Sequence, residues 1–272
     1  MLKVLVTGGT GYLGRQVVTH LLETGYTARI MSRKPQPTDL QPGSEWAQAQ
    51  MESEMELAEA VKGCDVIVHT ATNPQQAQQI DVVGTQRLLK VAREAGVKHI
   101  VYISIVGIDR TPFPYYRYKL MVEEMIKSSD IPWSILRATQ FHEFVDLLLQ
   151  QAAKIPFVSL LPTDFKVQTV DAREVAQRLC KLVTSGPSGH APDYAGPEVL
   201  TIGEMAHTWL TWQGMRRLIV PLWLPGKFAR RVRRGENTCP DEPLRGQTTW
   251  SQWLQEQRYT PVTGGRNHAS VS

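Results

Sequence analysis

A tyrosine and a lysine lie four residues apart in the segment FPYYRYKLMVEEMI, residues 113–126. Positions four apart share one face of an α-helix, so Tyr115 and Lys119 are neighbours if this segment is helical. A nearby ammonium favours the phenolate and lowers the pKa of a tyrosine from about 10, which brings proton donation closer to neutral pH. Tyr116 and Tyr118 lack this spacing to Lys119. The alternative is that Tyr115 only packs at the start of an ordinary helix, as aromatic side chains often do.

A glycine-rich segment near the N-terminus, VTGGTGYLG, could bind phosphate. It follows the apolar run KVLVT and precedes a segment with apolar residues at helical spacing. In this context Gly8, Gly11 and Gly14 allow a tight turn and a close approach of the backbone to a dinucleotide pyrophosphate, at the positive end of a helix. The alternative is a plain strand–turn–helix corner.

The end of the second expected strand, MSRKP, distinguishes between two cofactors. An acidic residue there would accept hydrogen bonds from the ribose of NAD, whereas a basic residue would pair with the 2′-phosphate of NADP. This chain has Ser32, Arg33 and Lys34 and no acid, which predicts NADP(H). The alternative is a pair of solvated surface cations.

Apolar strand-like runs alternate with helix-like segments along the first half of the chain. Strands are expected at residues 3–9, 27–33, 45–51, 65–71, 99–107 and 133–139, and helices at 13–25, 56–63, 81–96 and 115–128. This alternation predicts an α/β protein with a Rossmann-like parallel sheet and helices on both faces.

The second half of the chain is less regular. Helices are expected at residues 170–186, where Asp171 and Glu174 have capping-box spacing, at 200–214 and at 246–257. We therefore expect an NAD(P)-binding core over residues 1–140, and a mixed segment, 141–260, that completes the core and forms a small C-terminal substrate lobe. The polar tail 261–272 is expected to be disordered.

Composition excludes several classes of protein. The chain has 272 residues and a formal net charge of only +4, which is too mild for a nucleic-acid partner. Cys64, Cys180 and Cys239 have no metal-binding spacing, so no metal is expected and the thiols are expected to be reduced in a cytoplasmic protein. No apolar run reaches the roughly 18–20 residues of an integral membrane segment. The segment 218–235, apolar and then basic, is either a solvated helix face or a contact for a membrane surface or an acidic partner.

Six segments occur in the order typical of one known family: TGGTGYLG, VIVHTAT, DVVGTQRLL, VYISIVG, YYRYKLMVEEMI and IPWSILRATQF. Over residues 1–180 the chain resembles the atypical, NmrA-like branch of the short-chain dehydrogenase/reductase superfamily. The resemblance implies that Tyr115 is the general acid that protonates a carbonyl oxygen and that Lys119 binds the nicotinamide ribose. It implies that a serine on the preceding strand polarises the carbonyl; Ser104 is the candidate, although the next position, where many relatives are also polar, is Ile105.

The resemblance also implies where ligands bind. Gln50 occupies the position at which relatives often carry an aspartate against the adenine. His142, beside Glu143 on an expected loop, and Asn73 are the candidates that could face substrate. The expected cofactor-binding residues are Gly8, Thr10, Gly11, Tyr12, Leu13, Gly14, Ser32, Arg33, Lys34, Gln50, Thr70, Ala71, Thr72, Lys119, Ala138, Thr139, Gln140 and Phe141.

These observations predict an NADPH-dependent oxidoreductase that transfers hydride to a carbonyl or conjugated carbonyl of a small, fairly apolar molecule. A second reading is a non-catalytic NAD(P)H-binding redox sensor of the NmrA-like type, which acts through protein partners. A third is an isomerase or epimerase that uses its cofactor transiently. The sequence leaves the substrate and the oligomeric state open.

Overall fold

The computed structural model describes residues 2–239 and 244–259. The tail 261–272, which the sequence predicted to be disordered, lies outside the described residues. Within the described ranges no helix is long and apolar enough to cross a membrane.

The centre of the molecule is a seven-stranded sheet in the order β3-β2-β1-β4-β5-β6-β9, in which every neighbouring pair is parallel. Its strands are β1 (Lys3–Thr7), β2 (Thr27–Ser32), β3 (Ser44–Gln48), β4 (Val66–His69), β5 (His99–Ile105), β6 (Trp133–Ala138) and β9 (Gly189–His190).

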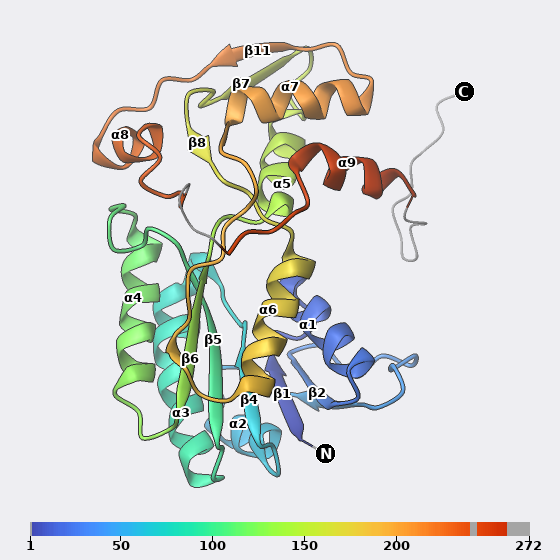
Figure 1. Ribbon diagram of the computed structural model, residues 1–272, viewed down its shortest axis with the longest axis vertical. Coiled ribbons are helices and arrows are strands. Elements are labelled where there is room, and N and C mark those ends of the chain that lie inside the picture. The colour runs from blue at the N-terminus through green and yellow to red at the C-terminus, as the bar shows by residue number, and fades with distance from the viewer. Residues whose placement is uncertain (1, 240–243, 260–272) are drawn as a thin grey trace.

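Helices cover both faces of this sheet, which confirms the predicted Rossmann-like α/β fold (Figure 1). One face packs against α1 (Tyr12–Glu23) and α6 (Ala172–Ser185). The other packs against α2 (Glu54–Val61), α3 (Gly84–Glu94) and α4 (Pro114–Lys127). Because both faces are buried, the strands are continuously apolar: in β1, Val4 and Val6 face the first layer and Leu5 faces the second.

Two local features differ from the expected pattern. The segment before α3 forms a short 3₁₀ helix, η1 (Pro74–Gln76), and a π-helix, η2 (Gln78–Val83), so the helix expected from residue 81 becomes α-helical only at Gly84. Asp171 caps α6 by accepting a hydrogen bond from the Arg173 amide at 2.7 Å, but Glu174 does not complete the predicted capping box. Its carboxylate accepts instead from the Gln247 amide at 2.8 Å.

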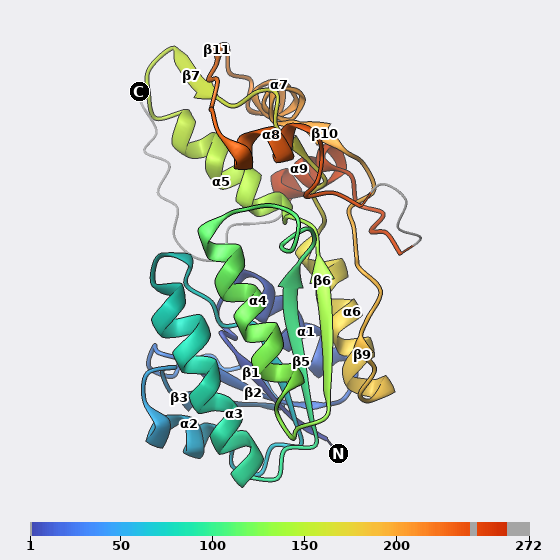
Figure 2. The same cartoon turned by 90° about the vertical axis from the view of Figure 1, so that its left-hand side faces the viewer.

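A smaller lobe stands over the carboxyl ends of the strands (Figures 1 and 2). Its own core is formed by apolar side chains that include Met205, Trp209, Trp250 and Trp253. It contains α5 (His142–Ala152), β7 (Val158–Leu161), β8 (Lys166–Val167), β10 (Leu200–Thr201), α7 (Ile202–Gln213), β11 (Leu218–Pro221), α8 (Lys227–Arg233) and α9 (Trp250–Tyr259).

The chain crosses between the core and the lobe several times, because α6 and β9 return to the core between lobe segments. The crossings are hydrogen-bonded to one another. The Val170 amide donates to the Gln140 carbonyl at 2.9 Å, the Thr139 amide to Tyr194 at 3.0 Å and the Gly246 amide to Ala195 at 2.8 Å. We call these paired crossings the neck.

Candidate active site

A cavity of about 820 Å³ lies between the carboxyl ends of the core strands and the lobe. It includes the point where the strand order reverses between β1 and β4, at which open α/β sheets bind ligands. Most of the predicted site residues line it: Gly8, Thr10, Gly11, Tyr12, Leu13, Gly14, Ser32, Arg33, Lys34, Thr70, Ala71, Thr72, Asn73, Ser104, Tyr115, Lys119, Ala138, Thr139, Gln140 and Phe141.

The glycine loop has no room for side chains. Gly8 has a positive φ of 65°, and a Cβ placed on it would lie 2.9 Å from the Ala71 Cα atom. A Cβ on Gly14 would lie 2.2 Å from the Gly8 carbonyl oxygen. The N-cap residue of α1, Gly11, offers no side-chain acceptor, so the first amides of the helix are available to an anion. This close-fitting loop suits a pyrophosphate.

The end of β2 presents two cations to the cavity. Arg33 and Lys34 are exposed and line it. The turn beneath them is held in place, because the Ser32 hydroxyl accepts from the Lys34 amide at 3.2 Å and is hydrogen-bonded to the Thr10 hydroxyl at 3.0 Å. The indole of Trp46 donates to the Lys34 carbonyl at 3.2 Å. A phosphate on the adenosine ribose would meet this pair of charges.

The predicted adenine contact at Gln50 was wrong. Gln50 is exposed and does not line the cavity, and its amide donates to the Glu56 carboxylate at 3.0 Å. Met51 and Glu52 line the cavity instead. The Glu52 Oε2 atom is buried and has no hydrogen-bond partner among the described residues, so it can accept from an exocyclic amine. The strand expected to end at residue 51 ends at Gln48, and Glu52 in AQAQMESE was the missed signal.

Tyr115 lies in the first turn of α4 and begins a chain of hydrogen bonds. Its hydroxyl lies 2.7 Å from Thr72 Oγ1, which in turn donates to Asp81 Oδ1 at 2.6 Å. The single hydroxyl proton of Thr72 is used on Asp81, so Tyr115 is the donor to Thr72. Asp81 is buried and also accepts from the Asn73 amide at 3.0 Å. The sequence analysis missed Asp81, which lies on the π-helix η2, a rare element that often marks functional sites.

Lys119 points under the same site from the next turn of α4. It is only 3% exposed, and its Nζ atom donates to the Ile103 carbonyl at 2.9 Å. The same atom lies 4.3 Å from the centre of the Tyr102 ring, a cation–π contact. Burial lowers the pKa of Lys119 to about 8. The amine is therefore fixed where a ribose hydroxyl could reach it.

The expected direction of the Tyr115 pKa shift was wrong. Burial raises the pKa of Tyr115, and the Asp81 carboxylate raises it further, because both disfavour a phenolate. The spacing to Lys119 suggested that the pKa of Tyr115 would be lowered. The motif itself does not show Asp81, the carboxylate that η2 brings close to Tyr115. Tyr115 is consequently protonated at neutral pH in the unliganded protein.

Ser104 lies on the side of β5 that faces α4. It is buried and lines the cavity, and its Oγ atom has no hydrogen-bond partner among the described residues. The carboxylate of Glu123, on α4, accepts two hydrogen bonds from Arg137 at 2.9 and 2.8 Å. The hydroxyl that the structure brings to Tyr115 is that of Thr72. Thr72 was predicted only as a cofactor contact.

The two substrate candidates differ in their positions. Asn73 lines the cavity, but its side chain also caps η1 by accepting from the Gln75 amide at 3.1 Å. His142 does not line the cavity, so the predicted substrate contact was wrong. It begins helix α5, not a loop, and its fully buried ring lies against Trp250 and Trp253, with Nε2 donating to the Thr248 carbonyl at 3.1 Å. Burial lowers its pKa to about 4.

Glu143 is also enclosed. Burial, with a smaller contribution from the Asp171 carboxylate, raises the pKa of its carboxyl to about 7. It lies beside the Tyr12 hydroxyl and Trp253, and its Oε2 atom has no hydrogen-bond partner among the described residues.

We expect the variant Glu143→Gln to stabilise the protein in a pH-dependent way. Between the ordinary pKa of a glutamate and about pH 7 the folded state holds a proton that the unfolded chain releases, so the free energy of unfolding falls as the pH rises. The amide cannot ionise, so the variant should be more stable by about 2 kcal/mol at pH 8 and by almost nothing near pH 5. Urea unfolding at the two pH values measures this difference. Equal stabilisation at both would contradict it.

The lobe side of the cavity is apolar. All four charged residues that line the cavity, Arg33, Lys34, Glu52 and Lys119, belong to the core. Phe228 lies 5.1 Å from Phe113 and 6.2 Å from Phe165 between ring centres. The lobe residues that line the cavity are Phe144, Val145, Leu148, Pro162, Phe165, Val167, Ile202, Phe228, Val232 and the polar Asn237; from the core, Ile103, Ile105, Phe113, Tyr116 and Phe141 adjoin them. Such a wall suits a neutral, flat ligand. In residues 2–239 and 244–259 no group of three or more His, Cys, Asp or Glu side chains could hold a metal ion.

Comparison with known proteins agrees with this geometry. The sequence profile of a family described as NAD(P)H-binding matches residues 8–185. A (4-alkanoyl-5-oxo-2,5-dihydrofuran-3-yl)methyl phosphate reductase of Streptomyces griseus is 27% identical over 205 residues, which cover 74% of this chain and 70% of the reductase. The photosystem II assembly factor Ycf39 of Trieres chinensis is 28% identical over 168 residues, which cover 59% of this chain and 51% of that protein.

The fold resembles that of an NADPH-dependent quinone oxidoreductase of Escherichia coli, solved with NADPH. The two superpose with a TM-score of 0.76 over 94% of this chain and 99% of the oxidoreductase, at 20% sequence identity.

Proposed function

Because the chain belongs to the NAD(P)H-binding family, in the atypical, NmrA-like branch of the short-chain dehydrogenase/reductases, we propose that it is an NADPH-dependent oxidoreductase that reduces a carbonyl or conjugated carbonyl of a small, apolar molecule. The observation that supports this proposal most directly is the hydrogen-bonded chain Tyr115–Thr72–Asp81. Tyr115 and Thr72 line the cavity, where the Tyr115 hydroxyl can reach an acceptor.

The residues of the core half fit NADPH. The absence of Cβ atoms at Gly8, Gly11 and Gly14 suits the close approach of a pyrophosphate, and the unpartnered Glu52 oxygen is an acceptor for the adenine amine. Arg33 and Lys34 would hold the 2′-phosphate, and Lys119 would bind the nicotinamide ribose. Ala138, Thr139, Gln140 and Phe141 would flank the nicotinamide.

The bound cofactor supplies hydride to the electrophilic carbon of the acceptor. Tyr115 gives its hydroxyl proton to the oxygen that becomes negative. Its raised pKa keeps the phenol protonated at neutral pH, so the proton is present when hydride arrives, and Thr72 and Asp81 hold the ring in position. The aromatic wall around Phe228 presents an apolar surface to the acceptor.

The apolar wall favours neutral acceptors. The Streptomyces griseus relative is described as a reductase of a phosphate ester, but the lobe side of this cavity has no cation to pair with a phosphate. The Escherichia coli structure is described as a quinone oxidoreductase, whose acceptor class is neutral and flat. We therefore expect quinones and enones to be better acceptors than phosphorylated or carboxylated compounds.

We expect this protein to oxidise NADPH in the presence of neutral quinones or enones, and to do so more efficiently than NADH. Nicotinamide absorbance, followed against a panel of quinones, enones, aldehydes, ketones and phosphorylated analogues, measures both preferences. Arg33→Ser should reduce the preference for NADPH by about tenfold or more, since it removes a charge-assisted contact to phosphate. Tight NADPH binding without turnover on any acceptor would reject the proposal that this protein is an oxidoreductase.

One observation favours a second candidate, an NADPH-binding regulatory protein without turnover. Ile105 occupies the position after Ser104 at which the resemblance implies a second polar residue. One relative is described as an assembly factor. The acceptor panel discriminates the two candidates, because a regulatory protein would bind NADPH and transfer no hydride.

A further inference from the structure

The outer end of the lobe carries an apolar sheet face whose side chains are exposed or half-buried among the described residues. Strands β7 and β11 pair in parallel, with Val158 opposite Leu218 and Leu160 opposite Val220 (Figures 1 and 2). These four side chains are exposed or half-buried, whereas the alternate residues of β7, Ser159 and Leu161, are buried. The solvent face of such a sheet is normally polar, but here it is entirely aliphatic.

Aromatic and aliphatic side chains extend this face at both ends. Phe157, just before β7, is 83% exposed, and Trp223, just after β11, is 70% exposed. Phe157 also has a φ of 63°, and it is the only described residue other than glycine with a positive φ. A bulky side chain in that region is strained, and such strain is typical of functional segments. We call Phe157, Val158, Leu160, Leu218, Val220, Leu222 and Trp223 the apolar tip.

The segments around the apolar tip carry charge of one sign. Residues 147–163 contain one lysine or arginine and residues 205–235 contain seven, and neither segment contains an aspartate or glutamate. Arg231 and Arg233 pair with Glu236 and Asp164. Arg217 donates to the backbone carbonyls of Ala153 and Ile155. Five cations are exposed and form no ion pair with a carboxylate in residues 2–239 and 244–259: Lys154, Arg216, Lys227, Arg230 and Arg234.

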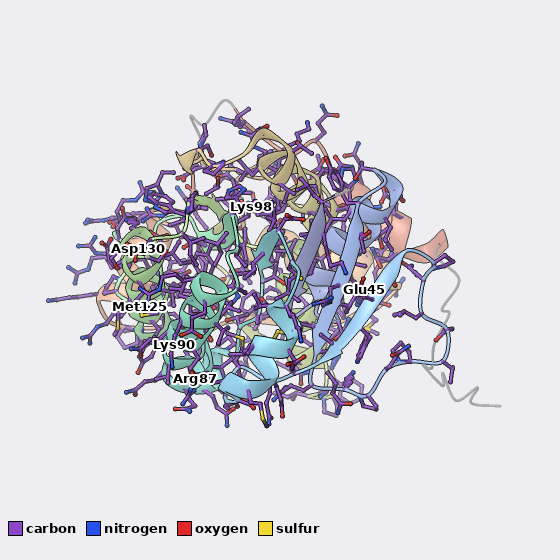
Figure 3. The ribbon with its side chains drawn as sticks, turned by 90° about the horizontal axis from the view of Figure 1, so that it is seen from below. Glu45, Arg87, Lys90, Lys98, Met125 and Asp130 are labelled. Atoms are coloured by element: carbon purple, nitrogen blue, oxygen red, sulfur yellow. The ribbon has the colours of Figure 1, made fainter. Side chains whose placement is uncertain are left out.

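The opposite end of the molecule has the ordinary mixed surface. Figure 3 views that end, where Lys90, Lys98 and Asp130 are labelled. Lys90 pairs with Glu54 at 2.5 Å, Lys98 with Asp65 at 2.8 Å and Asp130 with Arg93 at 3.2 Å. These three charged residues are each paired, unlike the five exposed cations of the lobe end.

We propose that the apolar tip docks onto an anionic lipid surface. Phenylalanine, tryptophan and leucine beside lysine and arginine are the side chains that enter the boundary between headgroups and acyl chains, and the cations attract anionic headgroups. A second copy of this chain fits less well, because a symmetric contact would place the cations against one another. A nucleic acid would use the cations but leave the aliphatic face exposed to water.

The full-length chain is tested by flotation with vesicles of phosphatidylcholine alone and of phosphatidylcholine mixed with phosphatidylglycerol. We expect binding to the anionic vesicles only, weakened by added salt. Phe157→Asn should weaken binding by about tenfold or more, because it removes an aromatic side chain that would insert into the lipid surface. Asparagine tolerates the left-handed backbone, so this variant should fold. Replacing Lys227 and Arg230 by glutamine should weaken binding by about fivefold each.

Met55→Ser is the matched control, since Met55 is an exposed apolar residue, 77% accessible, on α2 in the core. It should leave vesicle binding unchanged, and all variants should retain the NADPH affinity of the wild type. Absence of binding to anionic vesicles, or equal binding to neutral ones, overturns the proposal. Self-association that Phe157→Asn abolishes would assign the apolar tip to a second copy of this chain. Binding to polyglutamate but not to vesicles would assign it to an acidic protein. Either result would also overturn the proposal.

Discussion

Turnover with NADPH is expected to fall by about 100-fold or more when Tyr115 is replaced by phenylalanine. The substitution removes one oxygen atom, which is the donor to Thr72 and the proposed proton source for the acceptor. Without it the oxygen of the acceptor must take a proton from water or from a more distant group. NADPH affinity should change by less than about twofold, since a phenyl ring fills the same space.

The control for this variant is Tyr118→Phe. Tyr118 lies on the same helix, packs against the core beneath α3 and α4, and does not line the cavity. Loss of the Tyr118 hydroxyl should leave kcat/KM within about twofold of the wild type, because this hydroxyl lies outside the cavity that would hold acceptor and cofactor. Initial rates for the two variants, with a titration of NADPH against each, separate loss of chemistry from loss of binding. Equal rates for Tyr115→Phe and the wild type would reject the proposed acid.

The second large effect is expected from Gly14→Ala. Alanine would normally favour a helix at this position by about 1 kcal/mol over glycine. Here its Cβ would lie 2.2 Å from the Gly8 carbonyl oxygen and 2.8 Å from the Gly9 Cα atom. Both contacts are with backbone, so the loop must move out of the shape that receives the pyrophosphate. We expect NADPH affinity to fall by about 10-fold to 100-fold, measured by calorimetric titration.

Gly63→Ala provides the contrasting variant. Gly63 has a φ of 71°, but a Cβ there would have no neighbour within 4 Å. The strained backbone should lower stability by about 1 kcal/mol and leave NADPH affinity unchanged. Thermal unfolding of both variants then shows whether a loss of affinity reflects the loop or the whole fold. A Gly14→Ala protein that binds NADPH as the wild type does would contradict the assignment of this loop.

The sequence predicted the core well because its signals are local and mutually consistent. The strand expected at 27–33 is found at Thr27–Ser32, and the helix expected at 115–128 is found at Pro114–Lys127. Both depend on apolar spacing and on helix or strand ends, which a few neighbouring residues determine.

The failures required contacts between distant segments. His142 resembled a loop residue because Trp250 and Trp253, which enclose it, lie more than a hundred positions away in the chain. Asp81 was expected only as the first residue of a helix, because no nearby residue in the sequence indicates the π-helix that brings its carboxylate close to Tyr115. The apolar face of β7 and β11 depends on a register between segments separated by almost sixty residues.

The hydrogen-bonded neck has a consequence for exchange of ligands. A lobe joined through one linker can swing open, and such hinge motions take microseconds to milliseconds. Here the amides of Val170, Thr139 and Gly246 tie one crossing to the next, so opening would break several backbone hydrogen bonds together. Ligand entry should therefore depend on rotation of rim side chains such as Phe113 and Phe228, on the faster timescale of rotamer changes. The motions that admit ligands would then be rotations of aromatic side chains. The backbone amides of the neck would be among the slowest in the protein to exchange hydrogen.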